Sequence, residues 1–272
     1  MVNSADAERK NSVRWTGTLL YPALLVALFL GIQLLEQVLG MPEQHRATFA
    51  AIPALLALLI SLPWRVHRTW GTSQTWQALG IKGKPRDSLG ALINGLIKAV
   101  LLLGLALIGL TLAQGLNWQP RLSSELLLNG LALGLGVGFA EELLFRGWLL
   151  GELSLLIGKQ RALWLQAGLF SLVHLHFRLP LLPLIGLLGG LLMLGLALGL
   201  QRRADGGLLW GAIGLHGGLV GGWFLLTQGL VEVHASAPEW LKGVPATDPN
   251  PIGGLLGWLG LALLIWFRRR WW

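Results

Sequence analysis

The feature that most constrains this chain is the recurrence of apolar runs close to the length needed to cross a lipid bilayer. A membrane-spanning helix needs about 20 consecutive, mostly apolar residues, and such runs follow one another along the sequence. Of the 272 residues, 54% are hydrophobic and 12% are charged, whereas about 25% of the residues in a soluble domain are charged. The sequence therefore predicts an all-α, polytopic membrane protein that is embedded in the lipid bilayer and has it as a partner.

Eight transmembrane helices are predicted from these apolar runs. They cover residues 16–39, 47–64, 90–114, 123–143, 161–177, 181–201, 207–230 and 252–267. The apolar stretch from Arg146 to Gly158 is expected to be helical as well and to extend the fourth span. The predicted organisation is a polar tail (1–15), three N-terminal helices (16–114), a core (115–230), an outside loop (231–251) and a last helix with a basic tail (252–272).

The distribution of Lys and Arg predicts the orientation. With the N-terminus inside, the inside segments hold 15 of the 21 basic residues and the outside loops hold four. Basic residues favour the cytoplasmic side in short loops, so both termini are expected inside. Because the charges lie in these loops, the net charge of +8 indicates topology and gives no reason to expect a nucleic-acid partner.

Small residues recur at helical spacing within the predicted spans. Gly130, Gly134 and Gly138 lie four residues apart, and residues 214, 218 and 222 repeat the pattern in the seventh span. In lipid, small residues at this spacing let helix backbones approach closely. These glycines predict tight packing and do not by themselves indicate a function.

Three charged residues interrupt the fourth apolar run within the stretch "GFAEELLFRG". A charge at mid-membrane costs from about 2.5 to more than 10 kcal/mol, so such residues are usually paired, face water or do chemistry. Glu142 and Arg146 are four residues apart and are predicted to form an ion pair on one helix face. Glu141 is rotated about 100° from Glu142 and must find a different partner.

Histidines of the later spans are the candidate partners of Glu141. Gly158–Arg161 is the predicted reversal between two helices, and Glu141 and His174 lie at similar distances from it, about 20–25 Å. His216 lies in the seventh span, which begins on the same inner side of the membrane as this reversal. His176 is rotated by about 200° from His174, so both cannot face one site.

A carboxylate and two imidazoles inside a bundle can support hydrolysis by two routes. Glu141, His174 and His216 can hold a zinc ion that leaves one position for water. Alternatively, the carboxylate acts as a general base on water while a histidine stabilises the oxyanion. The competing hypothesis is that each histidine is a hydrogen-bonded packing residue.

Together these residues resemble the motifs of the CPBP family of intramembrane proteases, which includes the CAAX prenyl endopeptidases and the Abi-like bacteriocin-processing proteins. Glu141-Glu142-x-x-x-Arg146 matches EExxxR, and Phe170 to His174 matches FxxxH. His216 takes the place of a later histidine motif, and the similarity covers residues 120–230. The resemblance implies a bundle of about eight helices in which Glu141 activates water, His174 and His216 bind the oxyanion or a metal, and Glu142 and Arg146 support them. It also implies a peptide or membrane-protein substrate.

The sequence departs from the family pattern at Val220, where a small polar residue usually follows the last histidine. Either three functional side chains suffice, or Asn129 or Gln228 substitutes, or proteolysis is lost and a membrane scaffold, assembly factor or immunity protein remains. A transporter is a third hypothesis, since such a cluster can relay protons. The composition is typical of a bacterial inner membrane protein or one of an internal membrane.

Overall fold

The computed structural model describes residues 13–175, 179–243 and 249–272, and nearly all of its secondary structure is helical. The helices are α2 (Trp15–Val38), α3 (Glu43–Trp70), α4 (Thr75–Ala78), α5 (Pro85–Leu112), α6 (Ser124–Glu141), η1 (Glu142–Leu149), α7 (Leu150–Ile157), α8 (Lys159–Leu172), α9 (Leu181–Ala204), α10 (Trp210–Gly229), α11 (Glu239–Lys242), η2 (Pro251–Gly253), α12 (Leu255–Phe267) and η3 (Arg269–Trp271). The strands are β1 (Leu116–Trp118) and β2 (Val231–Val233).

Each predicted span coincides with a helix, but not every helix is long and apolar enough to cross a membrane alone. Five segments are long and apolar enough to do so: α2, Phe49–Trp70 in α3, α5, the continuous helix Ser124–Ile157, and α9. Helix α8 has 14 residues and ends at Leu172, so the predicted fifth span (161–177) extends too far over residues 173–175, and its last two residues lie outside the described ones. Helix α10, which is rich in glycine and contains His216, is not among the five. The structure thus supports a polytopic helical membrane protein and identifies five candidate spans.

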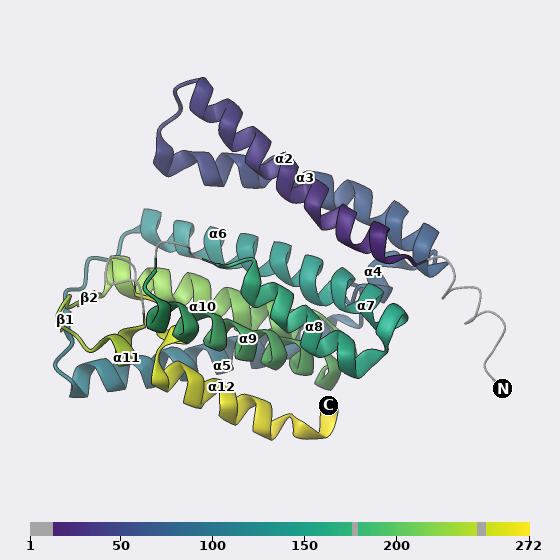
Figure 1. Ribbon diagram of the computed structural model, residues 1–272. Coiled ribbons are helices and arrows are strands. Elements are labelled where there is room, and N and C mark those ends of the chain that lie inside the picture. The colour runs from purple at the N-terminus through teal and green to yellow at the C-terminus, as the bar shows by residue number, and fades with distance from the viewer. Residues whose placement is uncertain (1–12, 176–178, 244–248) are drawn as a thin grey trace.

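A two-stranded ribbon closes one end of the bundle, where the sequence predicts only loops. Strands β1 and β2 pair antiparallel, with Leu116 opposite Val233 and Trp118 opposite Val231. Figure 1 shows this ribbon and α11 at one end, and α4 together with the α7–α8 reversal at the other. The reversal is at Gly158, as predicted, where φ is 83°.

Helix α10 lies at the centre and packs most extensively on α5 and α6. Its contact with α6 is made by glycine backbone: a Cβ atom on Gly134 would lie 2.6 Å from the carbonyl oxygen of Gly217, and one on Gly138 would lie 2.7 Å from Gly217 Cα. Close packing by Gly130, Gly134 and Gly138 is therefore confirmed. It draws α10, and with it His216, against the end of α6.

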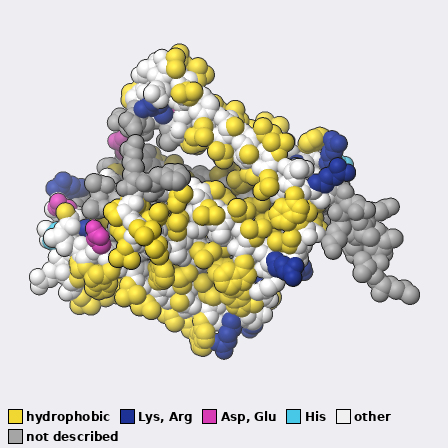
Figure 2. Space-filling model, in the orientation of Figure 1, with side chains coloured by type: hydrophobic (Ala, Val, Ile, Leu, Met, Phe, Trp, Pro, Cys, Tyr) yellow, Lys and Arg dark blue, Asp and Glu magenta, His cyan; other side chains and the backbone are white. Residues whose placement is uncertain are grey.

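The N-terminal hairpin α2–α3 stands apart from this core (Figure 1). It approaches the bundle at the α7 end and leans away from it toward its own tip. Large apolar side chains cover much of the molecule, and on the face in Figure 2 most Lys and Arg lie toward the α7 end, whereas Asp and Glu lie toward the opposite end. The asymmetry of charge read from the sequence is thus present in space.

Gly134→Ala and Gly136→Ala form a matched pair that tests the α6–α10 contact. A Cβ at residue 134 meets backbone, whereas one at residue 136 has nothing within 4 Å. We expect Gly134→Ala to destabilise the protein by about 1–3 kcal/mol through overpacking, and Gly136→Ala to be neutral or slightly stabilising. Thermal unfolding in detergent measures both, and equal midpoints would contradict the close approach.

Candidate active site

The acidic motif lies where a long helix changes its winding. Helix α6 begins at a Ser123 cap whose hydroxyl accepts from Leu126 N at 3.1 Å and continues into the π-helical segment η1. Such wide turns are frequent at functional sites. Arg202 of α9 donates to the carbonyl oxygens of Arg146 and Gly147 within this segment. Sequence reasoning used Arg202 only as a topology signal, because its distant backbone partners leave no local pattern.

The predicted ion pair is present and fully buried. Arg146 Nη1 donates to Glu142 Oε1 at 2.7 Å, and both side chains have 0% exposure. His216 Nδ1 lies 2.9 Å from the same oxygen. The carboxylate thus accepts from two helices and fixes the α10 histidine relative to η1.

The ring of Phe170, the first residue of the predicted FxxxH motif, is the centre of this packing. The guanidinium of Arg146 lies over its face, 3.9 Å from the ring centroid. The rings of His174 and His216 lie 4.9 and 5.7 Å away, and Phe145 packs edge-on at 5.2 Å. A cation over an aromatic face is attracted by the ring quadrupole, more strongly when it is desolvated. Phe170 therefore orients three of the predicted site residues.

Both histidines turn Nε2 toward Glu141. His174 Nε2 lies 3.8 Å and His216 Nε2 lies 3.9 Å from Glu141 Oε2. The Nδ1 atom of His174 is 2.7 Å from the carbonyl oxygen of Phe170, which can only accept, so Nδ1 carries a proton. In His216, Nδ1–H likewise faces the Glu142 carboxylate. Glu141 has thus found the separate partners that the helical rotation requires; His176 lies outside the described residues.

Exposure divides the five residues into two groups. Glu142 and Arg146 are at 0% and His216 at 6%, whereas Glu141 is at 28% and His174 at 31%. The supporting pair is sealed from solvent, while the side chains of Glu141 and His174 are partly exposed; the Glu141 Oε2 atom that faces the histidines is itself buried and has no direct hydrogen-bond partner. This is the arrangement expected of reactive groups held by a buried support.

The side chains around Glu141 are spaced more widely than the ligands of a zinc ion. No group of three or more His, Asp or Glu side chains among them is placed to hold a metal ion. Two ligands of a tetrahedral zinc ion lie about 3.4 Å apart, given bonds of about 2.0–2.1 Å. The separations of 3.8 and 3.9 Å from Glu141 exceed that value.

The position one turn beyond His216 carries no hydrogen-bonding group. Val220 is half-buried in α10. The predicted substitutes do not reach it: Asn129 and Gln228 are both exposed, and each lies 12 residues from its nearest site residue, about 18 Å along a helix. The prediction that Asn129 or Gln228 replaces the missing polar residue at position 220 is therefore wrong.

A second buried carboxylate, Glu152, joins the N-terminal hairpin to the core. It is fully buried and accepts from Thr18 of α2 (2.6 Å), Arg65 of α3 (2.9 Å), Thr69 of α3 (3.1 Å) and Trp148 of η1 (3.1 Å). Sequence reasoning missed this cluster, although a lone Glu within "LLGELSLL" carries the same signal of cost as Glu141.

The fold and the site define an integral membrane protein of apolar helices with an acid–histidine cluster inside the bundle. Residues 123–221 match the family described as Rce1-like, type II CAAX prenyl endopeptidase Rce1-like. The resemblance to the CPBP and CAAX protease family is thereby confirmed, and the matched region contains all five predicted site residues. Searches of curated proteins and of solved structures found no match to this chain.

Glu152→Gln tests whether the hairpin is held by this carboxylate. Arg65 is 14% exposed and would lose its buried counter-charge, so we expect a loss of stability of about 3 kcal/mol. Thermal unfolding measures the loss, and limited proteolysis after α3 measures release of the hairpin. Glu125→Gln, which changes an exposed acid of α6, is the control. An unchanged midpoint and cleavage pattern for Glu152→Gln would contradict this role.

Proposed function

We propose that the protein is an intramembrane endopeptidase that hydrolyses a peptide bond in a membrane-associated peptide or protein. The observation that carries the proposal is the convergence of two histidine Nε2 atoms on one oxygen of a partly exposed glutamate. The match of residues 123–221 to a family of prenyl endopeptidases supports the reaction class. The substrate is a chain segment that can reach Glu141 from the membrane.

In this mechanism Glu141 is the general base. Separations of 3.8 and 3.9 Å are too long for direct hydrogen bonds and suit a water molecule bridging the carboxylate and the imidazoles. Glu141 takes one proton from this water, whose oxygen attacks the scissile carbonyl carbon. When the tetrahedral intermediate collapses and the C–N bond breaks, Glu141 returns the proton to the leaving amine nitrogen.

The two histidines have different roles: His174 binds the water, and His216 stabilises the oxyanion. His174, with its proton on Nδ1, can accept a hydrogen bond at Nε2 from the second O–H of the water, whose hydrogen stays on the attacking oxygen. His216 keeps Nδ1–H on Glu142, so it donates from Nε2 only when the ring is doubly protonated. The Glu142 carboxylate stabilises that charged ring, which then stabilises the oxyanion. Arg146 and Phe170 hold Glu142 and both rings in place.

The mechanism routes no step through a metal ion, because the separations around Glu141 do not fit a zinc site. A chelator experiment tests the zinc hypothesis. Removal of zinc by a strong chelator is expected to leave proteolysis unchanged. Loss of activity, with recovery on adding zinc, would favour the metal route.

We further propose eight membrane-crossing helices with both termini inside, in which α8, α10 and α12 complete the five candidate spans. The packing of α10 inside the bundle supports this, because a helix covered by α5 and α6 requires less hydropathy than one facing lipid. The substrate would then enter from the inner, basic side. A bacterial inner membrane and the division into a hairpin-bearing N-terminal part and a catalytic core stay predictions.

Val220 favours a second candidate, a non-catalytic scaffold, assembly factor or immunity protein. Loss of one oxyanion donor lowers rates by about 10²–10³-fold, and the exposed Asn129 and Gln228 do not replace it. The convergence of both histidine Nε2 atoms on Glu141 Oε2 argues against this alternative, because a scaffold has no need of a buried carboxylate oxygen without a direct hydrogen bond.

Glu141→Gln is expected to abolish proteolysis, by about 10³-fold or more, because the amide cannot take a proton from water. The host lacking the protein would be restored with wild type, Glu141→Gln or the exposed control Glu125→Gln, and membrane-protein termini mapped by mass spectrometry. New cleaved ends should accompany wild type and Glu125→Gln alone. The same termini with all three proteins would overturn the peptidase and leave the scaffold.

A further inference from the structure

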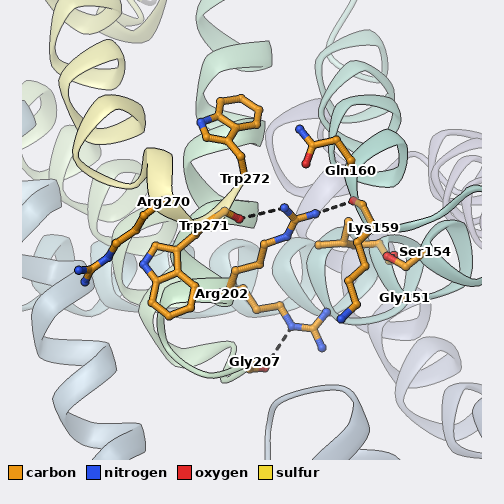
Figure 3. A pocket seen from close by; sticks show the side chains of 11 residues that line it. Gly151, Ser154, Lys159, Gln160, Arg202, Gly207, Arg270, Trp271 and Trp272 are labelled. Atoms are coloured by element: carbon orange, nitrogen blue, oxygen red, sulfur yellow. Dashed lines mark hydrogen bonds between the residues drawn. The ribbon is translucent and has the colours of Figure 1, made fainter.

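A basic pocket lies at the end of the bundle away from the ribbon and outside the candidate active site. It has a volume of about 610 Å³ and opens between the α7–α8 reversal, the end of α9 and the segment after α12. Figure 3 shows that Lys159 and Arg202 lie close together on one side of Trp271, while the Arg270 side chain extends away from them on the other side. The lining is Leu150, Gly151, Ser154, Lys159, Gln160, Arg202, Arg203, Gly207, Arg270, Trp271 and Trp272.

The side chains of the pocket carry positive charge that no Asp or Glu in the lining balances. Four lining residues are cationic and none is Asp or Glu. Arg202 donates to the carbonyl oxygens of Gly207 and Ala78 as well as to η1, and Arg203 donates to those of Trp271 and Lys159. Within the described ranges, none of the four cations forms a salt bridge. The two arginines shape the wall, Lys159 is exposed beside them, and the exposed Arg270 lies at the rim with its guanidinium 5.5 Å from the centroid of the Trp271 ring.

The start of α8 adds to this field. Gly158 precedes the helix and contributes no side-chain cap, so the first backbone N–H groups and the positive end of the helix dipole lie beside Lys159. Such termini favour anions. With Lys159 beside this terminus and Arg270 at the rim, the pocket is complementary to a compact anion that accepts several hydrogen bonds, such as a phosphate.

Aromatic side chains place the pocket at the level of the membrane interface. Trp271 and Trp272 line it, and Trp272 stacks on Trp164 with ring centroids 5.4 Å apart. Trp164, Trp266 and Phe267 are 48%, 53% and 67% exposed around it. Tryptophan is enriched at the headgroup level of bilayers. An anion bound here would therefore have lipid chains beside it.

We propose that this pocket binds the phosphate headgroup of an anionic phospholipid. Basic pockets between transmembrane helices on the cytoplasmic side suit such headgroups, and the exposed apolar rim accommodates the acyl chains. The assignment rests on the membrane placement proposed above but not on proteolysis. It is therefore tested by binding, on wild type and on the Glu141→Gln variant alike.

The experiment titrates the delipidated full chain in detergent with phosphatidylglycerol, phosphatidylcholine or inorganic phosphate. Thermal unfolding midpoints report binding to the folded state, and native mass spectrometry counts bound lipid. The test variant is Lys159→Gln with Arg270→Gln. Its matched control, Lys82→Gln with Arg86→Gln, removes the same charge from exposed residues near the same end of the bundle, outside the pocket lining.

We expect phosphatidylglycerol to raise the midpoint of wild type, of Glu141→Gln and of the control. For the test variant the apparent affinity should fall about 30-fold, from two basic residues near a lipid surface. Equal effects of both lipids, equal losses in test and control variants, or an unchanged test variant would each overturn the site. Stabilisation by inorganic phosphate at the same concentration would assign the pocket to a free phosphate and overturn the lipid.

Discussion

The ion pair between Glu142 and Arg146 is the interaction on which the site depends. Neither charge is exposed, and an isolated charge in the bundle interior would be strongly destabilising. Glu142 therefore has to accept from Arg146 and His216, and Arg146 has to lie over Phe170. These contacts set the positions of both histidines. Glu141, one residue earlier, faces both histidines through its Oε2 atom.

Backbone packing makes that convergence possible. Because glycines let α6 and α10 approach at the distance of a backbone contact, His216 reaches a carboxylate 74 residues away in the sequence. A larger residue at the crossing would separate the two helices and with them the two halves of the site. The glycine pattern is thus a condition for the chemistry as well as for folding.

The N-terminal hairpin and the basic end of the bundle are connected to the same π-helical segment. Glu152 ties α2 and α3 to Trp148 within it, and Arg202 binds two of its carbonyl oxygens from the wall of the basic pocket. The segment that presents the acidic motif is therefore held from three directions. Its irregular winding lies where Arg202 donates to the carbonyl oxygens of Arg146 and Gly147.

Much of this protein was determined by the sequence itself. Apolar runs indicated the helices, i and i+4 spacing predicted the Glu142–Arg146 pair, and the rotation of Glu141 predicted a separate partner, since all three follow from the fixed period of a helix. The tertiary structure decided what depends on distant contacts: the role of Phe170 between three side chains, the Glu152 cluster, the basic pocket and the failure of Asn129 or Gln228 to replace Val220. The periodicity of a single helix does not predict these features, because each depends on which helices pack together and on which residues lie at the same level along them.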